Sequence, residues 1–215
     1  MHPSDCPAWE YESFTNHEQI VGAQSEAVVK KLRKGELDTV TLAADSRHIH
    51  EFIFRSLTPK GHEYFAGHYR GEPFRCLRYY LVHIKGDPSV GYPPDSIPLL
   101  MRDVSRDIRA SIAALDAAHT VPNKQLAPED KLYYTVVVAC QVFELVLRIH
   151  PYANGNGHSA RFIVWAILGR YGYWPRDWPI EPRPANPPYV DLIVNYRNGN
   201  RLPLERYIVQ NIIGR

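Results

Sequence analysis

The segment from residue 129 to 149 is apolar on nearly every side, and it constrains the fold more than any other feature of the chain. A helix that is apolar all round is buried, so we expect this segment to be the central helix of a helical bundle. Pro128 suits its first turn. Gln141, Glu144 and Arg148 interrupt the apolar run, which predicts a core helix and not a membrane span.

Other segments show apolar residues at steps of three and four, the spacing of one helix face. They predict a mainly α protein with further helices over residues 15–34, 40–57, 96–119, 187–198 and 203–213. The last two flank an Asn-Gly-Asn turn at 198–200. A proline-rich stretch at 174–188 is predicted to be a tethering loop.

The composition is that of an ordinary globular protein, with 45% hydrophobic and 22% charged residues and a net charge of +2. This balance favours neither nucleic acid nor membrane as a partner. Cys6, Cys76 and Cys140 are odd in number and widely spaced, so we expect no disulfide framework and a reducing compartment. The N-terminus has no basic-then-apolar leader, and we predict a cytoplasmic protein.

A polar segment, His-Pro-Tyr-Ala-Asn-Gly-Asn-Gly-His-Ser-Ala-Arg, occupies residues 150–161. Gly155 and Gly157 lack bulk where the next helix begins, and a helix start offers unpaired N–H groups and partial positive charge. His150 precedes this turn and can exchange a proton near neutral pH. Arg161 can lean back toward the helix start. A base and a cation could thus surround one anionic group; the alternatives are a helix-ending histidine, an ordinary turn and a surface salt bridge.

This segment resembles the signature of the Fic domain family (Fic/Doc), which reads His-Pro-Phe-x-(Asp or Glu)-Gly-Asn-Gly-(Arg or Lys)-x-x-Arg. The positions that match in identity and spacing are His150, Pro151, Gly155, Asn156, Gly157 and Arg161. The resemblance extends over about residues 40–213 and is strongest at 132–172. It implies a Fic-type helical bundle with a small β-hairpin flap at 40–213, preceded by an arm and a helix at 1–39.

The resemblance also implies an activity, the transfer of AMP from ATP to a hydroxyl group of a target protein. In that activity His150 is the catalytic base, which takes the proton of the target hydroxyl. Gly155, Asn156 and Gly157 bind the α- and β-phosphates, with the Asn156 side chain as one donor. Arg161 contacts the terminal phosphate.

Two positions depart from the signature. Asn154 stands where the family has an acidic residue, and His158 stands where it usually has Arg or Lys. Mg²⁺ prefers carboxylate and phosphate oxygens, so a neutral amide at 154 weakens the metal position, and Asn154→Asp is predicted to raise Mg²⁺-dependent transfer. His158, when neutral, removes a positive charge from the phosphate pocket; when protonated, it could donate to a phosphate.

A β-hairpin is predicted before the central helices, from the aromatic run Tyr79 to Ile84 and the turn at 85–88. The Gly-His-Tyr-Arg-Gly stretch at 67–71 resembles the start of the Fic flap. That resemblance implies a target protein bound as an added strand. The candidate docking residues are His68, Tyr69 and Arg70. A structural hairpin with no binding role is the alternative.

Two other functions stay open. One is a nucleotide-binding Fic pseudoenzyme that regulates a partner through the flap. The other is a kinase or phosphocholine-type transferase that uses a different donor or orientation. The chain lacks the Ser/Thr-x-x-x-Glu-(Gly/Asn) inhibitory pattern of many Fic proteins. Control would therefore come from a separate inhibitor protein, or low intrinsic activity makes control unnecessary.

Overall fold

The computed structural model describes residues 5–82, 84 and 87–213, and within them the fold is mainly helical, as predicted. Short 3₁₀ turns add Tyr11–Ser13, Arg55–Leu57, Glu63–Phe65 and Pro94–Ser96. The α-helices are α1 (His17–Arg33), α2 (Thr39–Ala44), α3 (Arg47–Phe54), α4 (Ile97–Thr120), α5 (Pro128–Ile149), α6 (Asn156–Gly169), α7 (Tyr189–Arg197) and α8 (Leu202–Ile213).

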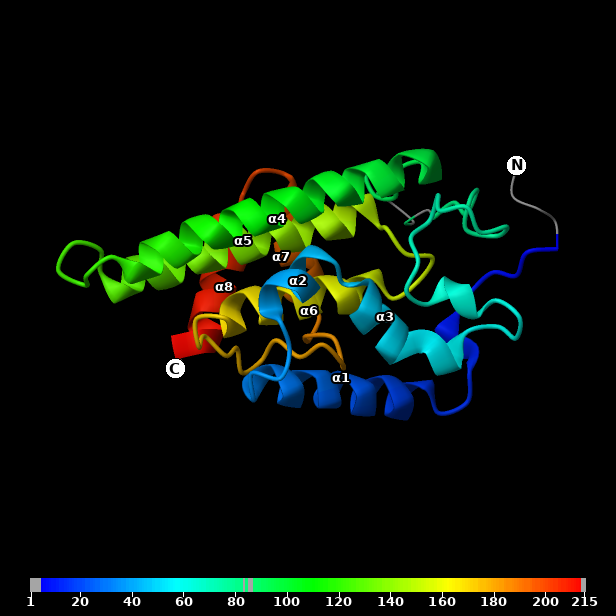
Figure 1. Ribbon diagram of the computed structural model, residues 1–215, viewed down its shortest axis with the longest axis horizontal. Coiled ribbons are helices and arrows are strands. Elements are labelled where there is room, and N and C mark those ends of the chain that lie inside the picture. The colour runs from blue at the N-terminus through cyan, green and yellow to red at the C-terminus, as the bar shows by residue number, and fades with distance from the viewer. Residues whose placement is uncertain (1–4, 83, 85–86, 214–215) are drawn as a thin grey trace.

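Helices α5 and α6 form the centre of the fold. The long helices α4 and α5 run side by side, and α6 lies between this pair and α1 (Figure 1). Nearly every residue of α6 is buried, because it contacts α1, α2, α3 and α5. By length and composition alone α5 could also cross a membrane, a test that buried core helices pass too. Here α5 packs against α4, α6 and α8.

The helix predicted over residues 40–57 is broken into α2, α3 and a 3₁₀ turn. Asp45 is extended at the break, where its carboxylate accepts from the Arg47 backbone N–H and pairs with the Arg47 guanidinium at 2.6 Å. Such local side-chain bonds compete with helical ones. The Ser46 hydroxyl lies 2.8 Å from the Tyr152 hydroxyl. The break therefore connects this part of the chain to the polar 150–161 segment.

The predicted β-hairpin flap is not seen. In the described part of residues 67–94, the chain forms turns, and one isolated antiparallel bridge joins Ile84 to Asp87. The predicted turn residues Lys85 and Gly86 lie outside the described residues. The physical reason is that backbone groups on both sides of the turn bond elsewhere: the Tyr80 carbonyl accepts from Arg70, and the Gly91 and Tyr92 N–H groups donate to carbonyls at the end of α5.

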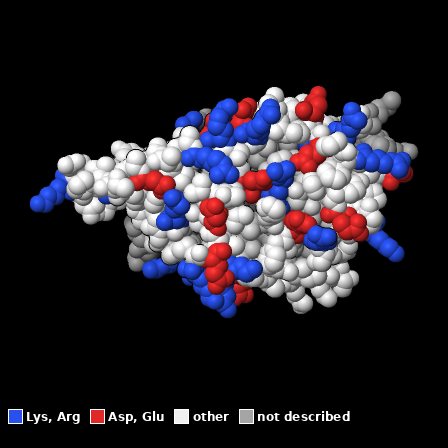
Figure 2. Space-filling model, in the orientation of Figure 1, with Lys and Arg blue, Asp and Glu red and all other residues white. Residues whose placement is uncertain are grey.

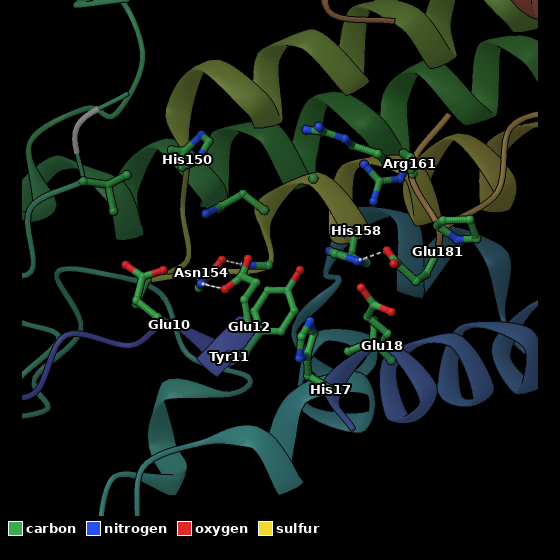
Figure 3. A pocket seen from close by; sticks show the side chains of 18 of the residues that line it. Glu10, Tyr11, Glu12, His17, Glu18, His150, Asn154, His158, Arg161 and Glu181 are labelled. Carbon is green, nitrogen blue, oxygen red and sulfur yellow. Dashed lines mark hydrogen bonds and ion pairs between the residues drawn. The ribbon is translucent and has the colours of Figure 1, made fainter. Parts of the chain in front are cut away.

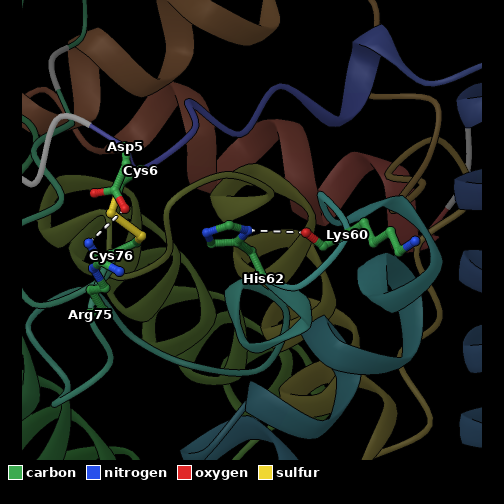
Figure 4. Close-up of a disulfide and its surroundings, with 6 residues drawn as sticks. All are labelled: Asp5, Cys6, Lys60, His62, Arg75 and Cys76. Carbon is green, nitrogen blue, oxygen red and sulfur yellow. Dashed lines mark hydrogen bonds and ion pairs between the residues drawn. A yellow bond between two sulfur atoms is a disulfide. The ribbon is translucent and has the colours of Figure 1, made fainter.

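Cys6 and Cys76 form a disulfide, so the expectation of unpaired cysteines is wrong (Figure 4). Beside it, Arg75 and Asp5 form an ion pair at 2.6 Å. The bond joins two segments 70 residues apart, a proximity that spacing in the sequence could not reveal. The cytoplasmic prediction rested partly on reduced cysteines, and this pairing removes that part of its support.

The N-terminal arm, residues 5–16, packs against the core through Cys6, Trp9, Tyr11 and Phe14, and most of its other residues are exposed. Its Trp9 side chain is buried against Phe54 and Phe65, and the indole N–H donates to the Leu57 carbonyl at 2.7 Å. The face of the molecule shown in Figure 2 is mixed in charge, with Lys and Arg interspersed with Asp and Glu. That face presents no field of a single sign that would steer nucleic acid to it.

Candidate functional site

A cleft of ≈ 690 Å³ lies where α5 ends and α6 begins (Figure 3). Its volume is in the range of small-molecule sites. The structure brings the predicted site residues together on one side of it: His150, Asn154, Gly155, Asn156, Gly157, His158 and Arg161. The opposite side consists of Glu10, Tyr11 and Glu12 of the arm, His17 and Glu18 of α1, and Glu181 to Arg183.

His150 caps the C-terminus of α5 in a left-handed conformation, with φ at 56°. Its Nδ1 lies 2.7 Å from the Leu147 carbonyl oxygen. A carbonyl only accepts, so Nδ1 carries the proton and Nε2 keeps a free lone pair. Burial lowers the pKa of His150, the Leu147 bond opposes this shift, and the charges of Arg70 and Arg197 lower the pKa further. At neutral pH the ring is thus a neutral base.

The Arg70 side chain stabilises the backbone at His150. It is fully buried and donates to four backbone carbonyls, those of His150 at 2.8 Å and of Tyr80, Tyr92 and Ile149 at 3.1 Å each. Two of these carbonyls belong to the end of α5, where a helix lacks internal donors. The guanidinium therefore stabilises the end of α5 and has no surface on which to dock a target.

The other two predicted docking residues, Tyr69 and His68, also contact side chains of the fold. Tyr69 is buried, its ring lies under the Arg47 guanidinium, and its hydroxyl donates to Asp45 at 3.4 Å. His68 is half-buried and pairs with Glu72 at 2.7 Å. These contacts support the fold around residues 68–72, and the predicted docking side chains form no exposed docking surface there.

The turn before α6 admits only glycine at position 155. Gly155 has φ at +73°, and a Cβ there would lie 2.5 Å from the Phe54 ring and 3.0 Å from His50 Nε2. His50 is itself held in place, since its Nε2 bonds the Asn154 carbonyl and its Nδ1 accepts from the Gly67 N–H, both at 2.9 Å. The buried His50 thus stabilises the turn through its hydrogen bond to the Asn154 carbonyl.

Gly155→Ala is therefore expected to lower the free energy of unfolding by about 2–4 kcal/mol, through left-handed strain and a clash with the Phe54 ring. Gly172→Ala is the matched control. Gly172 has φ at +77° with no atom within 4 Å of the added Cβ, so strain alone should cost about 1–2 kcal/mol. Urea unfolding measures both; equal losses would contradict the packing argument.

The start of α6 is open toward the cleft. The N-cap residue Gly155 provides no side-chain cap, and the first three N–H groups, of Asn156, Gly157 and His158, have no acceptor within the helix. The Asn156 side chain is already partly used, because it accepts from the Tyr152 N–H at 2.8 Å and donates to the Tyr152 carbonyl at 2.9 Å. One N–H of the Asn156 amide is thus used and a second is left, so donation from this side chain to a phosphate stays a prediction beside the backbone N–H groups.

Arg161 leans back over this helix start, as its spacing predicted. A Cβ on Gly157 would lie 3.0 Å from its Nη1. The guanidinium is buried and donates twice to the Ile180 carbonyl, at 2.9 and 2.7 Å, and once to the Tyr189 hydroxyl at 3.3 Å. It is not a surface salt bridge, and among the described carboxylates none forms an ion pair with it. Its charge is free to meet an anion in the cleft.

His158 is paired with Glu181, at 2.7 Å between Nε2 and Oε2. Burial lowers the pKa of His158, although the Glu181 bond opposes this, and the same bond lowers the pKa of Glu181. We therefore assign a neutral His158 that donates to an ionised Glu181, instead of a cation aimed at a phosphate. Sequence reasoning missed Glu181, since it lies in the proline-rich loop and no pattern distinguishes it.

Asn154 does not fit a Mg²⁺ ligand. Its amide oxygen accepts from the Gly155 N–H at 2.7 Å, and its Nδ2 donates to the Trp9 carbonyl at 3.1 Å. Its Nδ2 also donates to Glu12 at 3.1 Å (Figure 3). In the described part of the chain, no group of three or more His, Cys, Asp or Glu side chains could hold a metal. The predicted metal position is instead a contact with the N-terminal arm.

A search against models of known protein families finds no match for this chain, and a search of curated proteins finds no relative. The function is therefore argued from the residues of the cleft.

Proposed function

We propose that this protein is a nucleotidyltransferase that moves AMP from ATP to a hydroxyl group of a target protein, as the Fic resemblance implies. The observation that carries the proposal is a juxtaposition in one cleft. The free Nε2 of His150, the open N-terminus of α6 and the unpaired charge of Arg161 all border it. A base beside an anion site is what transfer from a phosphate donor to a hydroxyl requires.

In this reaction the target hydroxyl gives its proton to Nε2 of His150 while its oxygen attacks the α-phosphorus. A new P–O bond forms, the bond to the β-phosphate oxygen breaks, and pyrophosphate leaves. Negative charge on the phosphates is stabilised by the first N–H groups of α6 and by Arg161, which are already in position. The neutral state of His150 at pH 7 suits its role, because a protonated ring could not accept the proton.

The target would reach the cleft past Val82 and Ile84, which border it beside His150. Leu81 and Ile84 are exposed, 59% and 41% respectively, although apolar. Apolar exposure next to a cleft favours contact with a partner. Strand addition on this segment stays part of the proposal.

A second candidate is a nucleotide-binding pseudoenzyme that regulates a partner. Asn154 favours it, because its contacts with the arm leave no carboxylate at the position where the signature has one. ATP or AMP binding without turnover would distinguish this candidate from the transferase.

The test uses purified protein, Mg²⁺ or Mn²⁺, and ATP labelled at the α-phosphate, with cell lysate as acceptor. Wild type should label a target, and His150→Ala should lose at least about 100-fold of this rate, because general-base catalysis contributes that much. His48→Ala is the matched control, since His48 is a histidine of α3 that does not border the cleft. A parallel reaction uses ATP labelled at the γ-phosphate. Label transferred there and not from the α-phosphate would indicate a kinase, and ATP binding without any transfer would favour the pseudoenzyme.

A further inference from the structure

The side chain of Asn154 bridges the 150–161 segment and the N-terminal arm. Both of its Nδ2 contacts are acceptors from the arm: the Trp9 carbonyl and the Glu12 carboxylate, each at 3.1 Å. Its Oδ1 meanwhile accepts from the Gly155 N–H. This pattern needs two donors and one acceptor on one side chain. Asparagine provides them, and an ionised aspartate, which only accepts, does not.

The arm that Asn154 holds is a wall of the cleft. The wall residues are Glu10, Tyr11 and Glu12, on the 3₁₀ turn and its N-cap. The Tyr11 ring lies 4.9 Å from the Phe54 ring and 5.8 Å from the His158 ring, between centroids. The preceding part of the arm is anchored by the buried Trp9 and the Cys6 disulfide. Beyond Trp9, the ring contact of Tyr11 with His158 and the hydrogen bond of Asn154 to Glu12 join the wall to the turn that opens α6.

We infer that Asn154 and Glu12 are positioning residues that latch the arm across the cleft, and that this latch requires an amide at position 154. It follows that Asn154→Asp would open the arm instead of creating a metal site. The new carboxylate would face the Glu12 carboxylate and the Trp9 carbonyl, so two hydrogen bonds are replaced by repulsion. The effect on ATP affinity rests on the proposed function, whereas the effect on the arm does not.

An exchange of the two side chains tests the latch. The variants are Asn154→Asp, Glu12→Gln and the double variant Asn154→Asp/Glu12→Gln. Glu12→Gln alone keeps an oxygen that accepts from Asn154. In the double variant the amide introduced at position 12 can donate to the carboxylate introduced at position 154, which restores the contact with its polarity reversed. Contact residues of this kind are expected to be non-additive in a double-mutant cycle. Asn195→Asp, at an exposed position of α7, controls for the added charge.

Hydrogen exchange of the arm is the first readout, because it needs no ligand. The Ser13 and Phe14 N–H groups, bonded to the Glu10 and Tyr11 carbonyls, report opening of the wall. Asn154→Asp should speed their exchange by about tenfold or more, and Glu12→Gln and Asn195→Asp by less than about threefold. The double variant should exchange about threefold more slowly than Asn154→Asp, because the contact with position 12 returns while the bond to the Trp9 carbonyl does not. Unchanged exchange in Asn154→Asp, or no rescue in the double variant, would overturn the latch.

Calorimetry of ATP with and without Mg²⁺ is the second readout. Asn154→Asp should weaken ATP binding several-fold under both conditions, and the double variant should recover part of it. If Asn154→Asp instead gained Mg²⁺-dependent affinity with its arm still protected from exchange, position 154 would be a metal position and the inference would be wrong. Failure of wild type to bind ATP would sink the proposed function alone, since the exchange data judge the latch independently.

Discussion

Arg70→Met is expected to lower the free energy of unfolding by about 3–5 kcal/mol, because it removes a donor from four backbone carbonyls at once, although the Ile149 carbonyl keeps a second donor, the Tyr92 N–H. An unsatisfied buried carbonyl costs about 1–3 kcal/mol, and methionine fills a similar space without a donor. The desolvation cost of the buried cation is relieved in the variant, which keeps the loss below the sum of four such penalties. The expected result follows from the burial of Arg70 and not from its charge.

Urea unfolding of both proteins measures this effect. Arg75→Met is the matched control: Arg75 pairs with Asp5 at 2.6 Å, but its side chain is 70% exposed, so the loss should stay within about 1 kcal/mol. The carbonyl of His150 is among those released in Arg70→Met, so this variant should also lose transfer activity at temperatures where it remains folded. A loss from Arg70→Met no larger than that of the control would show that the buried guanidinium does not hold the end of α5.

Lowering the pH from 7 to 5 is expected to destabilise the protein by at least about 2 kcal/mol. Burial lowers the pKa of His50 from 6.5 to about 3, with the Asn154 carbonyl bond opposing the shift. The unfolded chain therefore binds a proton below pH 6.5 that the native protein does not bind, and stability falls as the pH falls. At pH 5 this difference amounts to about 2 kcal/mol for His50 alone. His150 and His158, whose pKa values burial also lowers, act in the same direction.

The pH range of the expected loss, 7 to 5, identifies histidines and not carboxyl groups as its source. The carboxyl groups whose pKa is lowered in the fold, such as Asp45, Asp116 and Glu181, start from values of 3.8 to 4.5, so their contribution is lost only in more acid solution. Unfolding in urea at pH 7, 6 and 5 tests how the free energy of unfolding depends on pH. In His50→Gln the number of protons taken up on unfolding should fall by up to one, which makes this dependence weaker. Equal stability of the wild type at pH 7 and 5 would contradict neutral burial of His50. The pKa of His150 is lowered from the usual histidine value of 6.5, so the ring stays neutral to lower pH. Transfer activity should therefore decline in acid only below pH 6.5.

The helices could be predicted because their signals are local. The apolar run at 129–149 became α5, and the glycines at 155 and 157 marked the start of α6, with Arg161 folded back over it. Each of these features depends on residues within a few turns of one another. The break between α2 and α3 was missed, since the extended backbone of Asp45 is stabilised partly through Ser46, whose partner Tyr152 lies more than 100 residues away.

Local patterns were enough to predict most helices, the turn that opens α6, and which polar residues border one cleft. The partners of those residues depend on tertiary contacts. The Asn154 amide oxygen accepts from the neighbouring Gly155 N–H, and its amide nitrogen donates to the Trp9 carbonyl, 145 residues away in the chain. Arg70 was singled out by its pattern, yet packing turned it inward, and Cys6 found Cys76 across 70 residues. Backbone preference and helical periodicity act between near neighbours, whereas the partner of a polar side chain depends on which distant segment the core brings against it.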